Sequence, residues 1–396
     1  MEHLVQTRKA LTILTGMLLL AFAFCIQSFG ASDIDALKAS YPHWNLSDKA
    51  QYDKLVKIDD FIEKNKDKGF VAAFDWDGTL YCEKMVIKEL NPLDNIYGGQ
   101  GGFYIWGAFN KDKFGSFNLF PSFNPEGDDF KDDVLQKVKV VENRLPDGMH
   151  NTALPPTMPV APFPIYNADG FSKFSLETTI FLLGMTPEQI KKAEAKYFEA
   201  YSPAQYAFYP MFDVLQKMCD SGYNVWIITG SSPYFVTNML TYLQENVAYT
   251  SDRHYDFSKL IITKDNNYDP AQSHIAGNGA KLTKEGTLSA VYDDRFLTND
   301  YVKNNGLLFI TDKQGKYLVI TNLETKFKTN AAFVAGNTDG DLYDTAYAME
   351  GSKLAPNTFA ICVAPPETSK VYQYLQKFPL NSVILTMEEA YPQGSK

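Results

Sequence analysis

The sequence predicts an α/β fold, a Rossmann-like parallel sheet with flanking helices, and an inserted cap module. Short runs of continuous apolar residues alternate with segments of helical spacing, as in a parallel sheet with crossover helices. Two runs, VAAF at 71–74 and AAFVA at 331–335, are apolar throughout, which suits strands buried on both faces. Polar residues come soon after each run: Asp75 follows the first directly, and Asn337 follows the second after Gly336. We therefore expect a ligand-binding crevice at the carboxyl ends of the strands.

The segment before the first strand predicts an amphipathic helix within 46–68. Gly69 is suited to end this helix, and the apolar run at 71–74 then begins the sheet. The apolar positions that form the helical face are Leu55, Ile58, Phe61 and Ile62.

The stretch at 83–203 has a different character from the rest of the chain. It contains GGQGG at 98–102 and a proline cluster at 154–164, with many aromatic residues between them. Such a stretch predicts an inserted cap module with long loops. Its last part predicts a helix in which Thr186 is the N-cap and Pro187 opens the first turn.

The alternation of strands and helices resumes after the cap, so residues 31–82 and 204–396 are predicted to form one core. A second insertion is predicted at about 246–329, with a strand at 288–292 and a hairpin at 307–321 that turns at Gln314-Gly315. The other predicted elements are helices at 211–221, 233–244 and 341–349, strands at 223–229, 331–335, 358–364 and 382–386, and a helix at 367–376.

The N-terminal 30 residues are predicted to be a signal peptide outside the fold. Arg8 and Lys9 precede an uncharged apolar stretch at 10–26, and cleavage is expected after Gly30 or after Ala31. The alternative is an uncleaved anchor, because the apolar stretch approaches the length of a membrane-spanning helix. With cleavage, the mature protein would be periplasmic or secreted, with no stable membrane association.

Composition narrows the classes of partner. The net charge is −10 and the Lys and Arg residues are scattered, so the sequence lacks the basic patches of a nucleic-acid-binding protein. Partners that are small molecules or cationic are expected. Three cysteines remain after signal cleavage, and their spacing fits neither a disulfide framework nor a metal site: Cys82, Cys219 and Cys362.

Two aspartates follow the first apolar run in FDWDGTLY at 74–81. Side chains two residues apart on a strand share a face, so Asp75 and Asp77 are expected to face the same crevice, whereas Trp76 packs on the other side. Two like charges this close favour a cation between them, and Mg²⁺ prefers carboxylate oxygens. Gly78 and Thr79 can present backbone N–H groups to an anion. Alone, the pattern is equally compatible with a solvated pair at a strand-to-turn junction.

Two other strand ends carry residues that suit the same chemistry. WIITGSS places the Thr229 hydroxyl, Gly230 and Ser231 at the start of a helix, which is an arrangement typical of anion sites. The run at 331–335 leads into GNTDGD, which supplies oxygen ligands for a divalent cation from Asn337, Asp339 and Asp341. A cation is also needed to offset the anion, and we select Lys316 among four candidates: Lys313, Lys316, Lys326 and Lys328.

Together these motifs resemble those of the haloacid dehalogenase (HAD) superfamily of phosphatases. FDWDGTL is similar to the first motif, WIITGSS to the second and VAGNTDGD to a form of the fourth. The resemblance covers the segments 68–81, 210–243 and 330–363. The signal, the large insertion and the GNTDGD form are similar to secreted bacterial phosphatases of the phosphorylcholine phosphatase and phosphoserine phosphatase-like type.

The resemblance implies a secreted, Mg²⁺-dependent phosphomonoester hydrolase that acts on a small organic phosphate through an aspartyl-phosphate. Asp75 would be the nucleophile and Asp77 the proton donor and then the base. Thr229 would hydrogen-bond the phosphoryl group while Lys316 neutralises it. Mg²⁺ would be held by Asp75, the Asp77 carbonyl, Asn337 and Asp341, and the phosphate would be bound by Gly78, Thr79, Gly230 and Ser231.

One departure keeps alternatives open. Many relatives have aspartate where Asn337 stands, so the metal ligand in this loop is left open among Asn337, Asp339 and Asp341. A catalytically weak or inactive binding protein is therefore the alternative function. Transfer to an acceptor other than water is not distinguished, whereas dehalogenation is disfavoured because it leaves Asp77 without a role.

Aromatic residues of the predicted cap suggest one substrate class. They could form a box for a quaternary ammonium group, such as that of phosphorylcholine, by cation–π attraction. The alternative is that they form the cap's own small core. The residues concerned are Tyr97, Phe103, Tyr104, Trp106 and Phe109.

Overall fold

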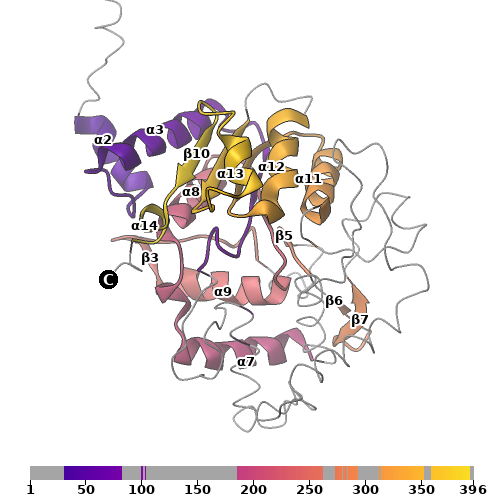
Figure 1. Cartoon of the computed structure of the whole chain (residues 1–396). Helices are drawn as coiled ribbons and strands as arrows, with labels where there is room; N and C mark the ends of the chain where they lie inside the picture. The colour runs from indigo at the N-terminus through magenta and orange to yellow at the C-terminus, as the bar shows by residue number, and fades with distance from the viewer. Residues whose placement is uncertain are drawn as a thin grey trace, which may run out of the picture.

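The structure is a computed structural model that describes residues 31–82, 100, 103, 185–261, 273–278, 280–282, 284–292, 311, 314–351 and 358–392. Figure 1 shows these residues as coloured ribbon. The predicted signal peptide, most of the predicted cap at 83–203 and four of the five aromatic residues proposed for a cage lie outside them. No helix among the described residues is long and apolar enough to cross a membrane.

A six-stranded parallel sheet forms the centre of the protein, in the order β10-β9-β8-β1-β2-β5. The predicted fold class, a parallel sheet with flanking helices, is thus confirmed. β1 lies between β8 and β2, so the carboxyl ends of these three strands meet at one edge. The strands are β1 (Val71–Phe74), β2 (Asn224–Ile228), β5 (Ile275–Ala276), β8 (Ala331–Gly336), β9 (Phe359–Val363) and β10 (Ser382–Leu385).

Both faces of the sheet are covered, which explains why its strands are almost entirely apolar. Along β1 the side chains alternate: Ala72 and Phe74 join one buried apolar cluster, and Val71 and Ala73 join another. The first cluster includes apolar side chains of α3 (Lys49–Lys64), α8 (Tyr209–Asp220) and α9 (Pro233–Asn246). The opposite face is covered by α11 (Gln314–Phe327), α12 (Leu342–Ala346) and α13 (Lys370–Leu375), which lie side by side in Figure 1.

The helix that ends the predicted cap is present and packs on the core. α7 (Pro187–Ala200) begins with a capping box in which Thr186 accepts from the Gln189 N–H, as the sequence predicts. It lies along α9, below it in Figure 1. Phe103 is fully buried between Tyr197 and Phe235, so packing rather than ligand contact explains this one member of the proposed cage.

The predicted hairpin at 307–321 is wrong over its described residues, because 314–327 form the helix α11. Val319 and Ile320 favour strands locally, but their side chains are buried against the sheet on a wide helical face. β5 also comes from the stretch expected to be an insertion, and it extends the central sheet beside β2. These two segments belong to the core; the remaining domain boundaries stay predictions.

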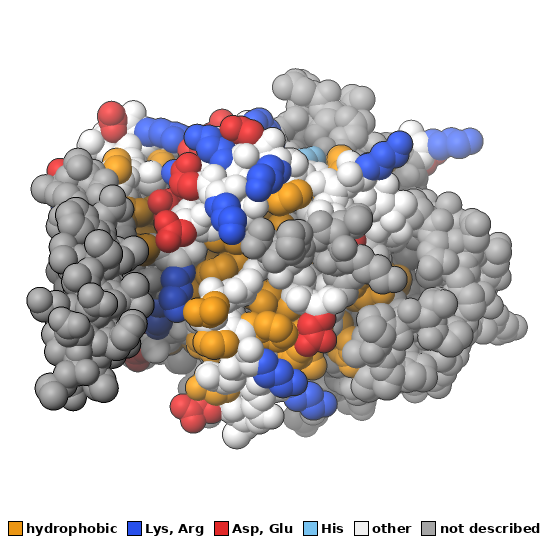
Figure 2. Space-filling view, turned by 90° about the horizontal axis from the view of Figure 1, so that it is seen from above, with side chains coloured by type: hydrophobic (Ala, Val, Ile, Leu, Met, Phe, Trp, Pro, Cys, Tyr) orange, Lys and Arg blue, Asp and Glu red, His pale blue; other side chains and the backbone are white. Residues whose placement is uncertain are grey.

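The smaller elements lie around this core. Two short antiparallel ribbons pair β3 with β4 and β6 with β7. On the face in Figure 2, Lys and Arg side chains are interspersed with Asp and Glu over the described part. The elements not yet given are α2 (Ala31–Ser40), η3 (Pro203–Gln205), β3 (Ala248–Thr250), β4 (Arg253–His254), β6 (Ala280–Leu282), β7 (Leu288–Tyr292), η6 (Asp339–Asp341), the π-helical η7 (Tyr347–Gly351) and α14 (Met387–Ala390).

Candidate active site

The two aspartates of FDWDGTLY lie at the carboxyl end of β1. The Asp75 N–H still donates to the Ala335 carbonyl of β8, so its backbone continues the sheet. Trp76 is fully buried, stacks on Tyr81 and meets the edge of Phe212, which confirms its predicted packing role. The sheet therefore fixes the positions from which both carboxylates project.

Gly78 is required at its position for two reasons. Its φ is +76°, which side-chain-bearing residues rarely adopt, and a Cβ there would lie 1.7 Å from Nδ2 of Asn337. The Asn337 amide thus sits directly against the backbone that follows Asp77. Among the described residues, no hydrogen bond to this side-chain amide is found, so its oxygen is available to a ligand.

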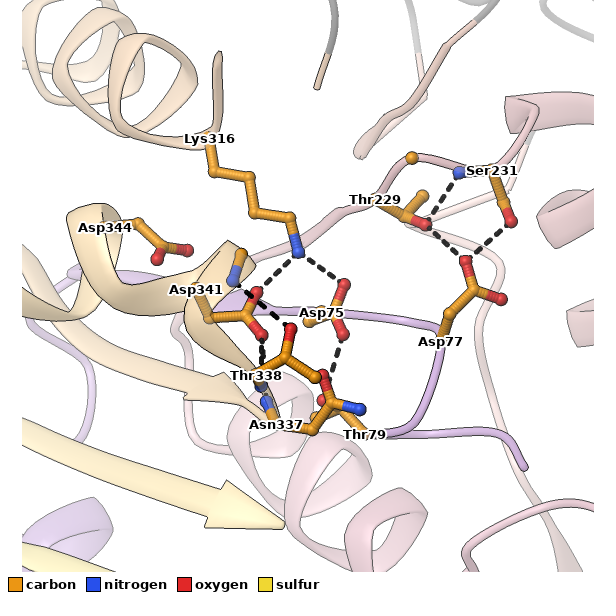
Figure 3. Close-up of polar contacts among 12 residues, drawn as sticks. Asp75, Asp77, Thr79, Thr229, Ser231, Lys316, Asn337, Thr338, Asp341 and Asp344 are labelled. Atoms are coloured by element: carbon orange, nitrogen blue, oxygen red, sulfur yellow. Dashed lines mark hydrogen bonds and ion pairs between the residues drawn. The ribbon is translucent and has the colours of Figure 1, made fainter. Parts of the chain in front are cut away.

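Asp75 is buried and shares a cation with a second carboxylate, as Figure 3 shows. Its Oδ1 lies 2.6 Å from Lys316 Nζ, and its Oδ2 accepts a hydrogen bond of 3.1 Å from Thr79 Oγ1. Lys316 also reaches Asp341 Oδ1 at 2.5 Å. The lysine selected from sequence is therefore at the site, although it stands in the first turn of α11 rather than in a hairpin turn.

Asp77 faces the loop after β2. Its Oδ2 accepts hydrogen bonds from Ser231 Oγ at 2.7 Å and from Thr229 Oγ1 at 3.3 Å. The Ser231 N–H in turn donates to Thr229 Oγ1. The two hydroxyls therefore hold the Asp77 carboxyl on the opposite side of the site from Lys316 (Figure 3).

The two aspartates of the loop after β8 have different hydrogen-bond partners. Oδ2 of Asp341 accepts from the N–H groups of Asn337 and Thr338, at 2.9 and 3.1 Å. Asp339 instead turns away and accepts from the N–H groups of Lys370 and Val371 at the start of α13. Asp339 is thus occupied by a helix start, which leaves Asn337 and Asp341 facing the site.

Burial and mutual repulsion shape the electrostatics. Desolvation raises the pKa of Asp75 well above its usual value, and the Asp341 carboxylate raises it further, while the Lys316 ammonium acts in the opposite direction. Desolvation also raises the pKa of Asp77, whereas the hydrogen bond from the Ser231 hydroxyl lowers it. Burial lowers the pKa of Lys316, but the carboxylates of Asp341 and Asp75 outweigh it, so the net shift is upward and the ammonium stays charged.

A further buried carboxyl, Asp344, was not found by sequence reasoning. Its Oδ1 accepts from the Thr345 N–H, and it lies near Asp341 and Lys316 in Figure 3. Desolvation and the Asp341 carboxylate raise the pKa of Asp344 well above its usual value. Its helical spacing of three from Asp341 was the only signal in the sequence.

The predicted phosphate-binding amides are only partly available. The Gly78 N–H donates to the Tyr81 carbonyl at 2.7 Å, and the Thr79 N–H donates to that of Trp76 at 3.3 Å. The expectation that both face an anion is therefore not met. Beyond Ser231, the Ser232 N–H is taken by the Gln100 side-chain oxygen at 2.5 Å, which brings one described residue of the predicted cap against the start of α9.

The donor set fits a hard divalent cation. Among the described residues, the carboxylates of Asp75 and Asp341 share the ammonium of Lys316, so negative charge is in excess even when Asp77 carries a proton. The free Asn337 amide oxygen adds a neutral ligand beside them. Carboxylate and amide oxygens are what Mg²⁺ prefers. Among the described residues, no group of three or more His, Cys, Asp or Glu side chains that could hold a metal ion is found.

Comparisons with known proteins give weak structural likenesses. No protein-family model and no curated protein sequence matches the chain. Three solved structures are similar to it at 12% identity: a conserved protein of unknown function from Anaerococcus prevotii (TM-score 0.40, covering 83% of this chain and 90% of that one), a phosphoserine phosphohydrolase-like protein from Francisella tularensis (0.34, 82% and 98%), and a cytosolic 5′-nucleotidase IIIB bound to cytidine (0.37, 87% and 88%).

The protein's own geometry agrees with the HAD-like arrangement that the sequence resemblance implies. The three strand ends that carry the motifs are adjacent in the sheet, in the order β8, β1, β2. The residues that were matched separately in the sequence, Asp75, Thr229, Lys316 and Asp341, meet at that edge, as Figure 3 shows.

Proposed function

We propose that the protein is a phosphomonoester hydrolase in which Asp75 is the nucleophile. The observation that carries the proposal is the position of Asp75, which is buried at the sheet edge and bonded to both Lys316 and Thr79. A carboxylate in a site with excess negative charge is not needed for stability, since a buried charge costs free energy unless it is balanced. Such a group is expected to serve a ligand or a reaction.

In the first step, a carboxylate oxygen of Asp75 attacks phosphorus, and the bond from phosphorus to the ester oxygen breaks. Asp77 supplies the proton that the leaving oxygen takes up. Burial raises the pKa of Asp77 and so favours its protonated form, whereas the Lys316 ammonium bonded to Asp75 favours the carboxylate there. Ser231 and Thr229 orient this carboxyl through their hydroxyls.

In the second step, water attacks the aspartyl-phosphate and Asp75 leaves as the carboxylate. Asp77, which lost its proton in the first step, accepts one from the attacking water. Lys316 keeps its charge beside Asp75 throughout and offsets the negative charge of the phosphoryl oxygens. Orthophosphate is then released.

The finer points of the proposal rest on the sequence and on the donor set. Asp75, the Asp77 carbonyl, Asn337 and Asp341 would hold Mg²⁺, which would neutralise phosphoryl charge. The signal-like segment at 1–30 supports a periplasmic or secreted location. The substrate class is a small organic phosphate, with phosphorylcholine as the first candidate.

Hydrolysis of p-nitrophenyl phosphate with Mg²⁺ tests the activity. Wild type should release p-nitrophenol, and Asp75→Asn should not. Equal rates for the two proteins would contradict the proposal. A panel of phosphorylcholine, phosphoserine and sugar phosphates, compared by kcat/KM, then identifies the substrate.

The alternative is a binding protein that has kept the fold without turnover. Asn337 favours it, because an amide removes one charge from the metal ligands that many relatives have. Binding without turnover would show as stabilisation of the protein by a phosphate ester, with no phosphate released over hours. Replacing the amide by a carboxylate, in Asn337→Asp, would then be expected to create or raise activity.

A further inference from the structure

Asn278, in the turn after β5, is buried and lies between two parts of the proposed site. Its Nδ2 donates to the Gly230 carbonyl at 2.9 Å, and its backbone N–H donates to the Ser231 carbonyl at 3.0 Å. Its Oδ1 accepts from the Thr311 N–H at 2.8 Å. One side chain thus bonds the loop after β2 and the segment before α11.

The backbone around Asn278 is fitted closely to the same loop. A Cβ on Gly277 would lie 2.2 Å from the Ser231 carbonyl oxygen, so only glycine allows this approach. The Thr229 N–H donates to the Ala276 carbonyl at the end of β5. The position of the loop that carries Thr229 and Ser231 is therefore set from the β5 side.

Thr311, the second partner of Asn278, lies close in sequence to Lys316. Thr311 lies shortly before the start of α11 at Gln314, and Lys316 is in the first turn of that helix. The loop after β2 supplies the hydroxyls that bond Asp77, and α11 supplies the ammonium that bonds Asp75. The two aspartates thus receive their partners from segments that Asn278 connects.

We propose that Asn278 is a positioning residue that fixes the distance between the Thr229–Ser231 loop and Lys316. This inference rests on the proposed function for its effect on rate, but not for its effect on structure. Among the described residues, the hydrogen bonds of Asn278 go to Gly230, Ser231 and Thr311 rather than to either aspartate, so its effect passes through the loop after β2 and the segment before α11. Small displacements of groups around a reacting centre cost about 10- to 100-fold in rate.

Two variants and one matched control test the proposal. Asn278→Ala removes both side-chain bonds, and Asn278→Asp keeps the shape but places an oxygen against the Gly230 carbonyl. Asn381→Ala is the control, since Asn381 also ties its amide to a backbone carbonyl, that of Thr358, on the far side of the sheet. Hydrogen exchange is measured by mass spectrometry on the intact protein, alongside kinetics with p-nitrophenyl phosphate.

Both Asn278 variants should exchange faster in peptides spanning 229–232 and 311–317, and their kcat should fall about 10-fold or more with a smaller change in KM. Asn381→Ala should change neither. The cost of Ser231→Ala should also shrink in the Asn278→Ala background, because the hydroxyl is already displaced.

Wild-type kcat in both Asn278 variants would overturn the proposal, as would faster exchange in only one of the two peptides. If Asn278→Ala does not fold, Asn278→Asp provides the same comparison. If the wild type does not hydrolyse phosphate esters, the proposed function is contradicted, but the proposed role of Asn278 is not. The hydrogen-exchange data then decide by themselves whether Asn278 links the two segments.

Discussion

The charges of buried aspartates are compensated differently in two regions of this protein. Asp213 on α8 accepts three hydrogen bonds, from the N–H and Nδ1 of His43 and from the hydroxyl of Tyr255, at 2.8 to 2.9 Å. Both of its oxygens are used. At the sheet edge, by contrast, Asp75 and Asp341 share the single ammonium of Lys316.

The difference separates a structural carboxylate from carboxylates that we propose to be functional. The Asp213 cluster is complete within the chain and ties the N-terminal segment at His43 to the core. Within the part of the chain that the structure describes, the site carries more negative charge than its residues neutralise, so a bound cation is expected to stabilise it. Substitutions in both groups test this distinction.

Asp75→Asn should abolish turnover while leaving the fold intact. Loss of the nucleophile should lower kcat by about 10³-fold or more. The amide removes one of the crowded buried carboxylates, so the melting temperature should stay the same or rise. Steady-state kinetics and thermal unfolding of the same preparation measure both. A variant that unfolds and loses activity together would place Asp75 with Asp213 among the structural groups.

Asp213→Ala should have the opposite profile. It leaves the His43 N–H and the Tyr255 hydroxyl without their acceptor in a buried place, which should cost about 3 kcal/mol or more of unfolding free energy. Urea denaturation measures the loss. The kcat per folded molecule should stay near wild type, and a large drop in kcat at unchanged stability would contradict the comparison.

Glu194 on α7 is intermediate between the two groups in how completely its carboxyl group is hydrogen-bonded. It is fully buried, Asn238 donates to its Oε2, and its Oε1 has no hydrogen-bond partner among the described residues. Burial raises its pKa to about 8. The unfolded chain ionises near the ordinary value while the folded protein stays protonated, so stability is full at low pH and falls as the pH rises towards 8.

Glu194→Gln should remove this pH dependence. The variant should gain at least about 2 kcal/mol over wild type at pH 8, and little at pH 4.5. Urea denaturation of both proteins across this range measures the gain. Asn238→Ala is a useful companion, because it deletes the one bond to Glu194 without changing charge. An equal difference between wild type and Glu194→Gln at every pH would show that Glu194 is ionised when folded.

Mg²⁺ should stabilise the wild type by a small amount. A cation that binds only the folded site adds about 1.4 kcal/mol when its concentration is ten times Kd. Thermal unfolding with and without MgCl₂, and with EDTA, measures the effect. The Asp75→Asn variant should respond less than wild type, whereas Asp213→Asn should respond equally. Equal shifts in wild type and Asp75→Asn would place the cation elsewhere.

The sequence identified the parts of the site that are local and missed those that depend on tertiary contacts. The placement of these residues followed from strand ends alone, because each lies within three residues of the end of an apolar run: Asp75, Asp77, Thr229 and Asn337. The two-residue strand β5 was too short to recognise, and Asn278 after it had no local signal. Likewise, nothing near Asp339 indicated that its partners would be the N–H groups of Lys370 and Val371.

The helix α11 shows why a correct residue can be found within a wrong element. Leu318, Val319 and Ile320 form an apolar run that reads equally as a strand or as a buried helix. Packing of this run against the sheet decides for the helix. Lys316 was nevertheless identified, because the choice rested on the need for a cation rather than on local structure.

The contact of Asp339 with the start of α13 bears on how the protein is made. The acidic residues of the site are all present once the chain has been synthesised as far as Asp344, but the loop that carries Asn337 lacks its anchor until Lys370 and Val371 arrive. A chain shortened before residue 370 would contain every acid of the site without the loop being fixed. Activity should therefore appear only after α13 has been synthesised and has packed against this loop.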